Sequence, residues 1–431
     1  MEVATTESNF SVDKQKRVLS GMRPTGRLHL GHYFGALSNW VKLQNEYDCF
    51  YFVADWHALT THYEDTSSIA ENTLQVVIDW LSVGLDPKKS TLFVQSSVLE
   101  HAELHVLLSM ITPLSWLERV PTYKEQIENL KGRDLGTYGF LGYPLLQSAD
   151  IVLYGAPNQD LLVPVGEDQA PHVELTREVV RRFDSHYSFQ IRDVLFEKAA
   201  RPELGTIWHE FFEAQLGVNV SADGTVDRAK RAHIESELRR IASDVGVRNF
   251  LEKIGSNSRY FEVTEILIEP AYLPTETPRL PGLDGRRMAK SYGNAIWLSD
   301  PPDEIRAKTR NMMTDPQRVR RTDPGRPEIC PVFAWHKLFS PPETCARIDT
   351  ECRTAAIGCV DCKKQMAENL IRWIEPIQAK RKEFEAKPQQ VWDILDEGSR
   401  KARDVAQTTM GRVRNAIFHS DEARGRVTPE K

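Results

Sequence analysis

The chain has 431 residues, of which 41% are hydrophobic and 27% are charged, and its formal net charge is −6. This length suffices to bury a core and suggests two or three domains. The composition is that of a globular protein, and no apolar run approaches the roughly 18–20 residues that span a bilayer, so a membrane partner is not expected.

The negative charge is unevenly distributed along the chain. Residues 301–431 hold 25 Lys and Arg against 20 Asp and Glu, a balance of +5, so residues 1–300 carry −11. A basic C-terminal part suits a protein that binds a polyanion there, and a chance scatter of solvated charges explains the balance equally well. The first 16 residues are polar and lack a cleavage site, which predicts a disordered tail and a cytoplasmic protein.

Strand-type and helix-type segments alternate along residues 17–187. Arg17–Gly21 predicts a strand, a loop with Pro and Gly follows, and apolar spacing predicts a helix from about Leu30. Further strands are expected at Cys49–Ala54, Thr91–Val94 and Leu161–Val165, with helices at Ile69–Val83 and about Ala170–Phe183. This alternation predicts a parallel sheet with crossover helices.

Amphipathic helices replace this pattern between about Ser188 and Phe261. One helix face is expected from Leu204, Ile207, Trp208, Phe211 and Leu216, and a second from Ile234, Leu238, Ile241 and Val245, ended by Gly246. A polar turn with Asp223-Gly224 joins them, so this part predicts a small helical insertion. From Pro302 onward helices dominate, especially Asp361–Ala386 and Gln389–Phe418.

Residues 25–32, Thr-Gly-Arg-Leu-His-Leu-Gly-His, lie where the first strand leads into the first helix. Parallel sheets bind ligands beyond the carboxyl ends of their strands, small residues let the backbone approach a nucleotide, and a helix N-terminus favours phosphate. His29 and His32 at the helix start could therefore donate hydrogen bonds to phosphate oxygens. A pair of surface histidines on a capped helix is the alternative interpretation.

Residues 286–291, Arg-Arg-Met-Ala-Lys-Ser, follow a Pro- and Gly-rich loop at Thr275–Gly285. When a nucleophile attacks an α-phosphate, cations on a flexible loop can follow the charge onto the departing pyrophosphate. Arg287 and Lys290 supply such charges, and Ser291 supplies a hydroxyl group. A basic surface turn is the alternative for one short segment, and the order of the two segments argues against it.

Both segments resemble motifs of the class I aminoacyl-tRNA synthetases. His29–His32 is similar to their HIGH motif, Gly21–Gly26 to the preceding loop of the tryptophanyl and tyrosyl branch, and Arg287–Ser291 to the mobile KMSKS loop. Two positions depart from the family pattern, since Arg287 replaces the first Lys and Ala289 replaces the middle Ser. Arg keeps the charge without the geometry of an ammonium group, and Ala loses a hydroxyl, so we expect altered turnover rather than its abolition.

Three further runs, residues 53–60, 143–154 and 163–169, resemble the tryptophanyl-tRNA synthetases. In that family the aspartate at the position of Asp150 accepts the indole N–H, and Gln147 lies beside the side-chain pocket. A buried carboxylate there is satisfied only by a ring that donates a hydrogen bond, so such a site rejects phenylalanine. A helix N-cap is the alternative interpretation of Asp150.

The resemblance implies a complete set of site residues. The groups acting on the reacting phosphates are His29, His32, Lys124, Arg287, Lys290 and Ser291. ATP is bound by Arg23, Pro24, Thr25, Gly31, His32, Gly166, Glu167, Asp168, Leu280, Arg287, Met288, Ala289, Lys290 and Ser291. Tryptophan is bound by Gly21, Gln147, Asp150, Val165 and Gln169. A solvated helix lysine explains Lys124 equally well.

Five of the six cysteines lie between Cys330 and Cys362, and such clustering in a cytosolic chain favours a metal over disulfides. Cys330, Cys352, Cys359 and Cys362 are separated by 21, 6 and 2 residues, and four thiolates suit tetrahedral zinc or an iron–sulfur cluster. Residues 353–364 resemble the tryptophanyl subgroup that carries a [4Fe–4S] cluster near its anticodon region, so the cluster is preferred over zinc. Reduced cysteines in a helical domain are the third possibility, and Cys345 falls outside the set.

The resemblance also implies the reaction and the architecture. The reaction is that of a tryptophan–tRNA ligase, which uses ATP with Mg²⁺ to form tryptophanyl-adenylate and transfers tryptophan to the ribose 2′-OH of tRNA(Trp), as a homodimer. The implied fold is α/β, a Rossmann-type parallel-sheet nucleotide-binding domain with a helical C-terminal anticodon-binding domain. The rivals are a tyrosyl-tRNA synthetase and a non-catalytic synthetase-like protein that binds tRNA or senses tryptophan.

The expected strands and helices, together with the family resemblance, also predict the domain boundaries. We expect a tail at 1–16, the catalytic domain at 17–187 and 261–300, the helical insertion at 188–260, the anticodon-binding domain at 301–418, and a second tail at 419–431.

Overall fold

The computed structural model describes residues 13–121, 123, 136–166, 170–196, 228–274 and 280–419. It divides into two compact units, the first made of residues 1–13, 21–94 and 275–398, the second of residues 14–20, 95–274 and 399–431. Most of both expected tails lies outside the described residues, as do the expected helix face at 204–216 and the turn at 223–224. The domain boundaries expected from the sequence stay predictions.

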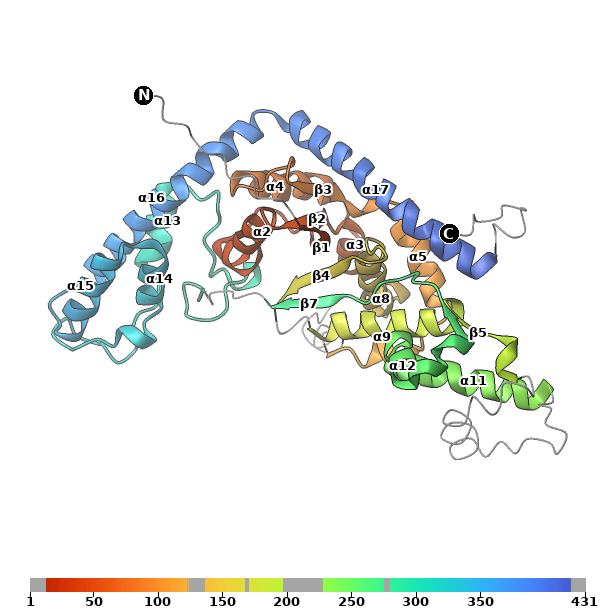
Figure 1. Cartoon of the computed structure of the whole chain (residues 1–431). Coiled ribbons are helices and arrows are strands. Elements are labelled where there is room, and N and C mark those ends of the chain that lie inside the picture. The colour runs from red at the N-terminus through yellow and green to blue at the C-terminus, as the bar shows by residue number, and fades with distance from the viewer. Residues whose placement is uncertain are drawn as a thin grey trace, which may run out of the picture. The chain divides into compact units, whose positions relative to one another are not determined.

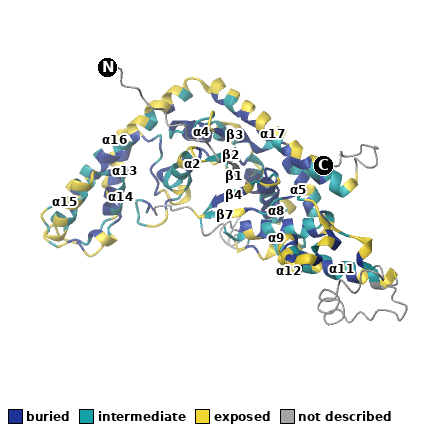
Figure 2. Ribbon diagram, in the orientation of Figure 1, coloured by how far each residue is buried: buried dark blue, intermediate teal, exposed yellow. Residues whose placement is uncertain are grey.

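Five strands form a parallel sheet in the order β3-β2-β1-β4-β7. They are β1 (Asp13–Met22), β2 (Tyr47–Val53), β3 (Ser90–Val94), β4 (Asp160–Val165) and β7 (Ala271–Pro274). Parallel pairing joins β2 to β3, β1 to β4, and β4 to β7. The end of β2 and most of β3 are buried (Figure 2), as expected for strands covered on both faces. The α/β class and the four strands expected from the sequence are confirmed.

In the first unit, the chain after β1 forms one helical segment of α1 (Leu30–His32), a π-helical turn (Tyr33–Leu37) and α2 (Ser38–Leu43). Further helices are α3 (Asp55–His62), α4 (Ile69–Ser82), α13 (Pro302–Arg310), α14 (Pro331–Phe339), α15 (Pro342–Arg353) and α16 (Cys359–Glu385). Three of these begin at a proline, whose missing N–H is no loss in a first helical turn. Helix α16 packs against α4, α13 and α14 (Figure 1).

The second unit is built largely from helices that pack in sequence order. They are α5 (Glu100–Ser109), α6 (Leu114–Glu118), α8 (Tyr138–Val152), α9 (Ala170–Tyr187), α11 (Arg228–Val245) and α12 (Val247–Ile254). Helix α8 packs against α5 and α9, and α9 packs against α11 (Figure 1). Two short strands, β5 (Phe189–Ile191) and β6 (Phe261–Val263), pair antiparallel.

The described part of the expected insertion has a hydrophobic core of its own. Ile234 and Leu238 of α11 and Phe250 of α12 are almost fully buried against Phe189 and Phe261. Helix α11 ends at Val245, directly before Gly246, which confirms the helix end that the sequence predicts. This small core explains how the segment folds without extending the sheet.

Helix α17 (Pro388–Phe418) closely approaches the backbone of β3 at Gly398. A Cβ atom at Gly398 would lie 1.8 Å from the carbonyl oxygen of Leu92, and this backbone atom cannot move independently. We expect Gly398→Ala to lower the free energy of unfolding by about 2–3 kcal/mol in urea denaturation. Gly411→Ala is the control, because it lies in the same helix with open space around it. Equal stability of the two variants would contradict the close contact.

None of the helices in the described ranges has the length and apolar character needed to cross a membrane.

Candidate active site

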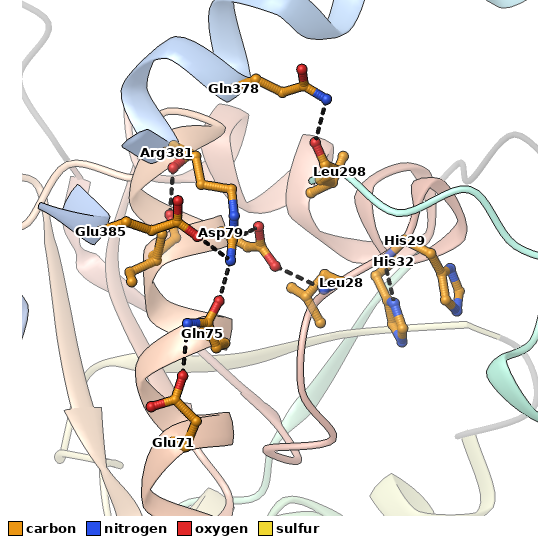
Figure 3. Close-up of polar contacts among 12 residues, drawn as sticks. Leu28, His29, His32, Glu71, Gln75, Asp79, Leu298, Gln378, Arg381 and Glu385 are labelled. Carbon is orange, nitrogen blue, oxygen red and sulfur yellow. Dashed lines mark hydrogen bonds and ion pairs between the residues drawn. The ribbon is translucent and has the colours of Figure 1, made fainter. Parts of the chain in front are cut away.

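The two histidines expected to meet phosphate lie at the start of the helical segment after β1, in the first unit (Figure 3). His29 is the N-cap of α1, and its backbone N–H donates to Nδ1 of His32 at 3.2 Å. The two ring centroids are 3.7 Å apart. Because Nδ1 of His32 accepts this hydrogen bond, a neutral His32 carries its proton on Nε2, where it can be donated to a ligand.

Both imidazoles are held in the neutral form. Burial and the charge of Arg287 lower the pKa of His29 to about 4. Burial, followed by the charges of His29 and Arg287, lowers the pKa of His32 to about 3. Nδ1 of His29 is buried and has no hydrogen-bond partner among the described residues. The pair therefore offers neutral N–H donors and one unused ring nitrogen at the position expected for phosphate.

The lowered pKa of His29 makes the stability of the protein depend on pH. As the pH falls below the ordinary histidine pKa of 6.5, the unfolded chain binds a proton that the folded chain does not bind until about pH 4. We expect the free energy of unfolding to fall by about 2 kcal/mol from this residue between pH 7 and pH 5. Urea denaturation should show this loss reduced in His29→Asn and unchanged in His233→Asn, which alters an exposed histidine. Identical pH dependence in both variants would refute the burial of a neutral His29.

The KMSKS-like segment lies against the loop and helix start that carry the histidines. The N–H of Gly31 is 3.3 Å from Sδ of Met288, which is buried. Nζ of Lys290 donates to the carbonyl oxygen of Thr25 at 3.3 Å. The two segments that the sequence pairs by resemblance are thus brought together within the first unit. Ser291 lies exposed in a short 3₁₀ turn, Lys290–Tyr292.

Residues 296–298, which follow the KMSKS-like segment, pair through their backbone with residues 28–30. We call residues 28–32, which carry His29 and His32, the histidine segment. The N–H of Leu30 donates to the carbonyl oxygen of Ile296 at 3.0 Å, and the N–H of Leu298 donates to that of Leu28 at 2.9 Å. Between them, His29 and Trp297 form an antiparallel bridge. We call residues 28–30 and 296–298 the paired segments.

Asn294, which the sequence analysis did not single out, holds the KMSKS-like segment in shape. Its Oδ1 accepts from the N–H of Ala289 at 2.9 Å, and its Nδ2 donates to the carbonyl oxygen of Arg287 at 3.0 Å and to Asp284 at 2.7 Å. The signal available in the sequence was the Gly-Asn pair at 293–294 directly after the motif, which is typical of a turn. The backbone N–H of Ala289 is therefore held by Asn294, a contact that does not depend on the side chain at position 289.

Asp150 is almost fully buried in the last turn of α8, in the second unit. The amide of Gln95 donates to both carboxylate oxygens at 2.8 and 2.9 Å, and Nδ1 of His101 lies 2.7 Å from Oδ1. Nε2 of His101 is 2.8 Å from the hydroxyl of Tyr154. Thr137 is the residue that caps α8, accepting from the N–H of Phe140, so the N-cap interpretation of Asp150 is wrong.

Gln95 and His101 were missed by the sequence analysis. Gln95 directly follows β3, at the carboxyl end of a parallel strand, where ligand-facing residues are common. His101 lies in the first turn of α5 and carries no local sign of its partner, Asp150. Together with Tyr154 they fix the orientation of the Asp150 carboxylate.

The remaining expected site residues divide between the two units. In the first unit Gly21 is the second-last residue of β1 and lies beside the Phe52 ring, Arg23 is half-buried, and Pro24 and Leu280 are buried. In the second unit Gln147, Val165 and Gly166 are half-buried. Lys124, Glu167, Asp168 and Gln169 lie outside the described residues. The roles given to all these residues stay predictions.

The four cysteines of the expected metal set belong to the first unit. Burial, then the charges of Cys330, Cys352 and Cys359, raise the pKa of the Cys362 thiol to about 12. Cys345 instead donates from Sγ to the carbonyl oxygen of His336, at 3.2 Å. Across the part of the chain that is described, no group of three or more His, Cys, Asp or Glu side chains has a geometry ready to hold a metal ion.

Comparison with known proteins identifies the family of this chain. The family described as tRNA synthetases class I (W and Y) matches residues 12–204 and 245–375, so its match is interrupted inside the expected insertion. The tryptophan–tRNA ligase of Ralstonia nicotianae is 48% identical over 93% of this chain and 98% of its own length. That of Thermotoga maritima is 44% identical, with the same coverage of both chains.

Solved structures show the same similarity. The crystal structure of tryptophanyl-tRNA synthetase from Campylobacter jejuni, complexed with ADP and tryptophan, has a TM-score of 0.67 and 27% identity, covering 93% of this chain and 99% of that one. The sequence identity extends over almost the entire length of the relatives. The HIGH-like and KMSKS-like segments also contact each other within one unit, as the family resemblance implies. The chain belongs to the class I tRNA synthetases of the tryptophan and tyrosine type.

Proposed function

We propose that this protein is a tryptophan–tRNA ligase. The observation that carries the proposal is the contact of Met288 and Lys290 with Gly31 and Thr25, which joins both nucleotide-binding motifs in one site. The amino acid follows from the relatives, since those with 48% and 44% identity over 98% of their length are tryptophan–tRNA ligases. Free tryptophan, ATP with Mg²⁺ and tRNA(Trp) are the substrates and partners.

The first step activates the amino acid. The carboxylate of tryptophan attacks the α-phosphorus of ATP, the bond to the β-phosphate oxygen breaks, and pyrophosphate leaves. His29 and His32 donate hydrogen bonds to phosphate oxygens as neutral imidazoles, which their lowered pKa values favour. Lys290 and Arg287 neutralise the negative charge that grows on pyrophosphate as it leaves. Because this charge is larger in the transition state than in bound ATP, its neutralisation lowers the activation barrier.

The second step transfers tryptophan to tRNA. The 2′-OH of the terminal ribose attacks the carbonyl carbon of tryptophanyl-adenylate, and AMP leaves with the bonding electron pair. Neither step forms a covalent bond to the protein, so catalysis consists of positioning and charge stabilisation.

Asp150 is proposed to recognise the indole ring. Its carboxylate is oriented by Gln95 and His101, and a carboxylate oxygen can accept the indole N–H. A phenylalanine side chain in the same place would leave this buried acceptor without the ring donor, which explains selectivity.

Charging of tRNA tests the complete reaction. With radioactive tryptophan, ATP and Mg²⁺, the protein should form acid-precipitable tryptophanyl-tRNA from a tRNA(Trp) transcript and release one AMP for each tryptophan transferred. A tRNA(Tyr) transcript with tyrosine is the control. Charging of that pair alone would identify a tyrosyl-tRNA synthetase.

The departures at Arg287 and Ala289 allow a test of the non-catalytic rival. The charge of Arg287 lowers the pKa of both His29 and His32, as a lysine charge at this position would. The backbone N–H of Ala289 donates to Asn294, and this bond needs no serine side chain. We therefore expect the double variant Arg287→Lys/Ala289→Ser to change the rate of adenylate formation by less than about tenfold. A wild-type protein without activity that the two substitutions make active would support the rival.

We also propose that Cys330, Cys352, Cys359 and Cys362 hold a [4Fe–4S] cluster. The support is that the charge of each of the other three thiols acts on Cys362, and that four cysteines form a complete donor set for such a cluster. The guanidinium of Arg318 lies 3.7 Å from Sγ of Cys352; burial raises the pKa of this thiol, and the charge of Arg318 acts in the opposite direction, toward the thiolate form that binds metal. Zinc bound by the same thiolates is the alternative.

Anaerobic purification distinguishes the two metals. The cluster predicts a broad absorption near about 400 nm with roughly four iron and four sulfide ions per chain, whereas zinc predicts a colourless protein with about one zinc ion. Cys359→Ser should lose the metal, and Cys345→Ser should keep it, because Cys345 bonds instead to the backbone of His336. Metal-free wild-type protein, or equal loss in both variants, would contradict the assignment.

The proposed enzyme works in the cytoplasm and, as the family resemblance implies, as a homodimer. Sedimentation equilibrium should therefore give about twice the chain mass of 49.2 kDa.

A further inference from the structure

Two side chains of α16, Gln378 and Arg381, lie three residues apart and so face the same way. The guanidinium of Arg381 pairs with the carboxylate of Asp79 and with the amide oxygen of Gln75, both on α4. Nε2 of Gln378 donates to the carbonyl oxygen of Leu298 at 3.1 Å (Figure 3). It also donates to the carbonyl oxygen of Asp300 at 2.8 Å. Helix α16 thus reaches two different parts of the first unit through one face.

Both contacts lead to the backbone around His29. The second carboxylate oxygen of Asp79 accepts from the N–H of Leu28 at 2.7 Å, and Leu28 directly precedes His29. Leu298, which Gln378 holds, donates its own N–H to the carbonyl oxygen of Leu28. Helix α16 therefore holds Leu298 directly through Gln378, and it holds Leu28 indirectly, because Arg381 pairs with the Asp79 carboxylate that accepts from the Leu28 N–H (Figure 3).

The Asp79–Arg381 pair is buried, so water cannot replace a hydrogen bond that either side chain loses. Asp79 is 0% exposed and Arg381 is 2% exposed. Burial raises the pKa of Asp79 to about 6, while Arg381 and the Leu28 N–H act in the opposite direction. Without Arg381 the carboxyl group would take up a proton more readily, and the Leu28 N–H would lose a charged acceptor.

We propose that Asp79, Arg381 and Gln378 are positioning residues that set the place of the histidine segment for adenylate formation. They do not touch the reacting groups; they fix the backbone on which His29 and His32 are carried. The inference rests on the proposed function, because it assigns these residues to ATP activation. It predicts a selective effect on ATP, since the expected tryptophan contacts around Asp150 belong to the other unit.

The kinetic test uses Arg381→Met, Arg381→Lys and Gln378→Leu in tryptophan-dependent pyrophosphate exchange. Arg381→Met should lower kcat/KM for ATP by at least about tenfold while the KM for tryptophan changes less than about twofold. Lys should restore part of the loss, and Gln378→Leu should show a smaller loss of the same kind. Arg306→Met is the control, because it removes an exposed ion pair between Arg306 of α13 and Glu368 of α16 that does not reach the paired segments.

A second readout does not need the activity. Hydrogen exchange of the peptide that contains Leu28 should be faster in Arg381→Met than in wild type and in Arg306→Met, at a temperature where thermal unfolding curves show all three folded. If Arg381→Met fails to fold, Asp79→Asn replaces it, because Asn keeps the shape and an acceptor oxygen but loses the charge. Asp79→Asn should give the same direction in both readouts.

The outcomes separate the inference from the function on which it rests. Wild-type protein without tryptophan-dependent exchange would remove the proposed function, and faster hydrogen exchange at Leu28 would still support the positioning role. Unchanged ATP kinetics and unchanged hydrogen exchange in a folded Arg381 or Asp79 variant would overturn the inference. The inference would also be overturned if kcat/KM fell equally for ATP and for tryptophan, in proportion to the loss of melting temperature, and if Arg306→Met behaved in the same way. That result would indicate a purely structural role.

Discussion

Replacing Lys290 with methionine is expected to lower kcat for tryptophan-dependent pyrophosphate exchange by roughly 10²–10³-fold. Nζ of Lys290 reaches the Thr25 carbonyl beside the histidine segment, while its side chain remains exposed and ready to meet a phosphate. Its charge matters most when the bond to pyrophosphate breaks, so kcat should fall more than the KM for ATP rises.

Arg286→Met is the matched control for Lys290. Arg286 lies four residues earlier in the same loop, but its guanidinium is already paired with Asp284 and lies over the Tyr292 ring, 4.5 Å from its centroid. Its loss should therefore change kcat by less than about threefold. A Lys290 variant no slower than the Arg286 variant would show that the KMSKS-like segment does not act on the departing group.

Replacing Asp150 with asparagine is expected to lower kcat/KM for tryptophan by roughly 10²–10³-fold, with kcat/KM for ATP at saturating tryptophan much less affected. Asn presents one N–H₂ group where the site needs acceptors, and Gln95 and His101 already point donors or ring nitrogens at this position. The indole N–H and the buried amide of Gln95 would then compete for one oxygen.

Two measurements separate recognition from loss of fold in this variant. Asp184→Asn changes another carboxylate of the same unit, one whose pKa burial raises, and it should leave tryptophan kinetics near wild type. The melting temperature reports any general destabilisation by Asp150→Asn. A variant that melts lower but activates tryptophan normally would restrict Asp150 to a structural role.

The regular elements were predictable because burial leaves a local pattern. Strands β2 and β3 are nearly continuous apolar runs, and α16 and α17 show helical spacing over 27 and 31 residues. The π-helical turn at Tyr33–Leu37 was not expected, because over five residues its wider spacing cannot be told from that of an α-helix. Strand β7, only four residues ending in Pro274, is too short to give a period.

The sequence predicted which residues form the motifs, but it did not predict the residues that hold them in place. His29, Lys290 and Asp150 stand in runs that carry chemistry by residue type and spacing. Asp79 reads only as a polar position in an apolar helix, and its partner Arg381 lies 302 residues later. Asn294 and His101 likewise gain their meaning from tertiary contacts, with Ala289 and Asp150, that no local pattern encodes.

The amino-acid dependence of ATP–pyrophosphate exchange tests the central claim most directly. Purified wild-type protein with ATP, Mg²⁺ and labelled pyrophosphate should form labelled ATP with tryptophan, and exchange with tyrosine or phenylalanine should be lower in kcat/KM by at least roughly 10⁴-fold. Exchange supported by tyrosine in preference to tryptophan, or no exchange with any of the three, would contradict it.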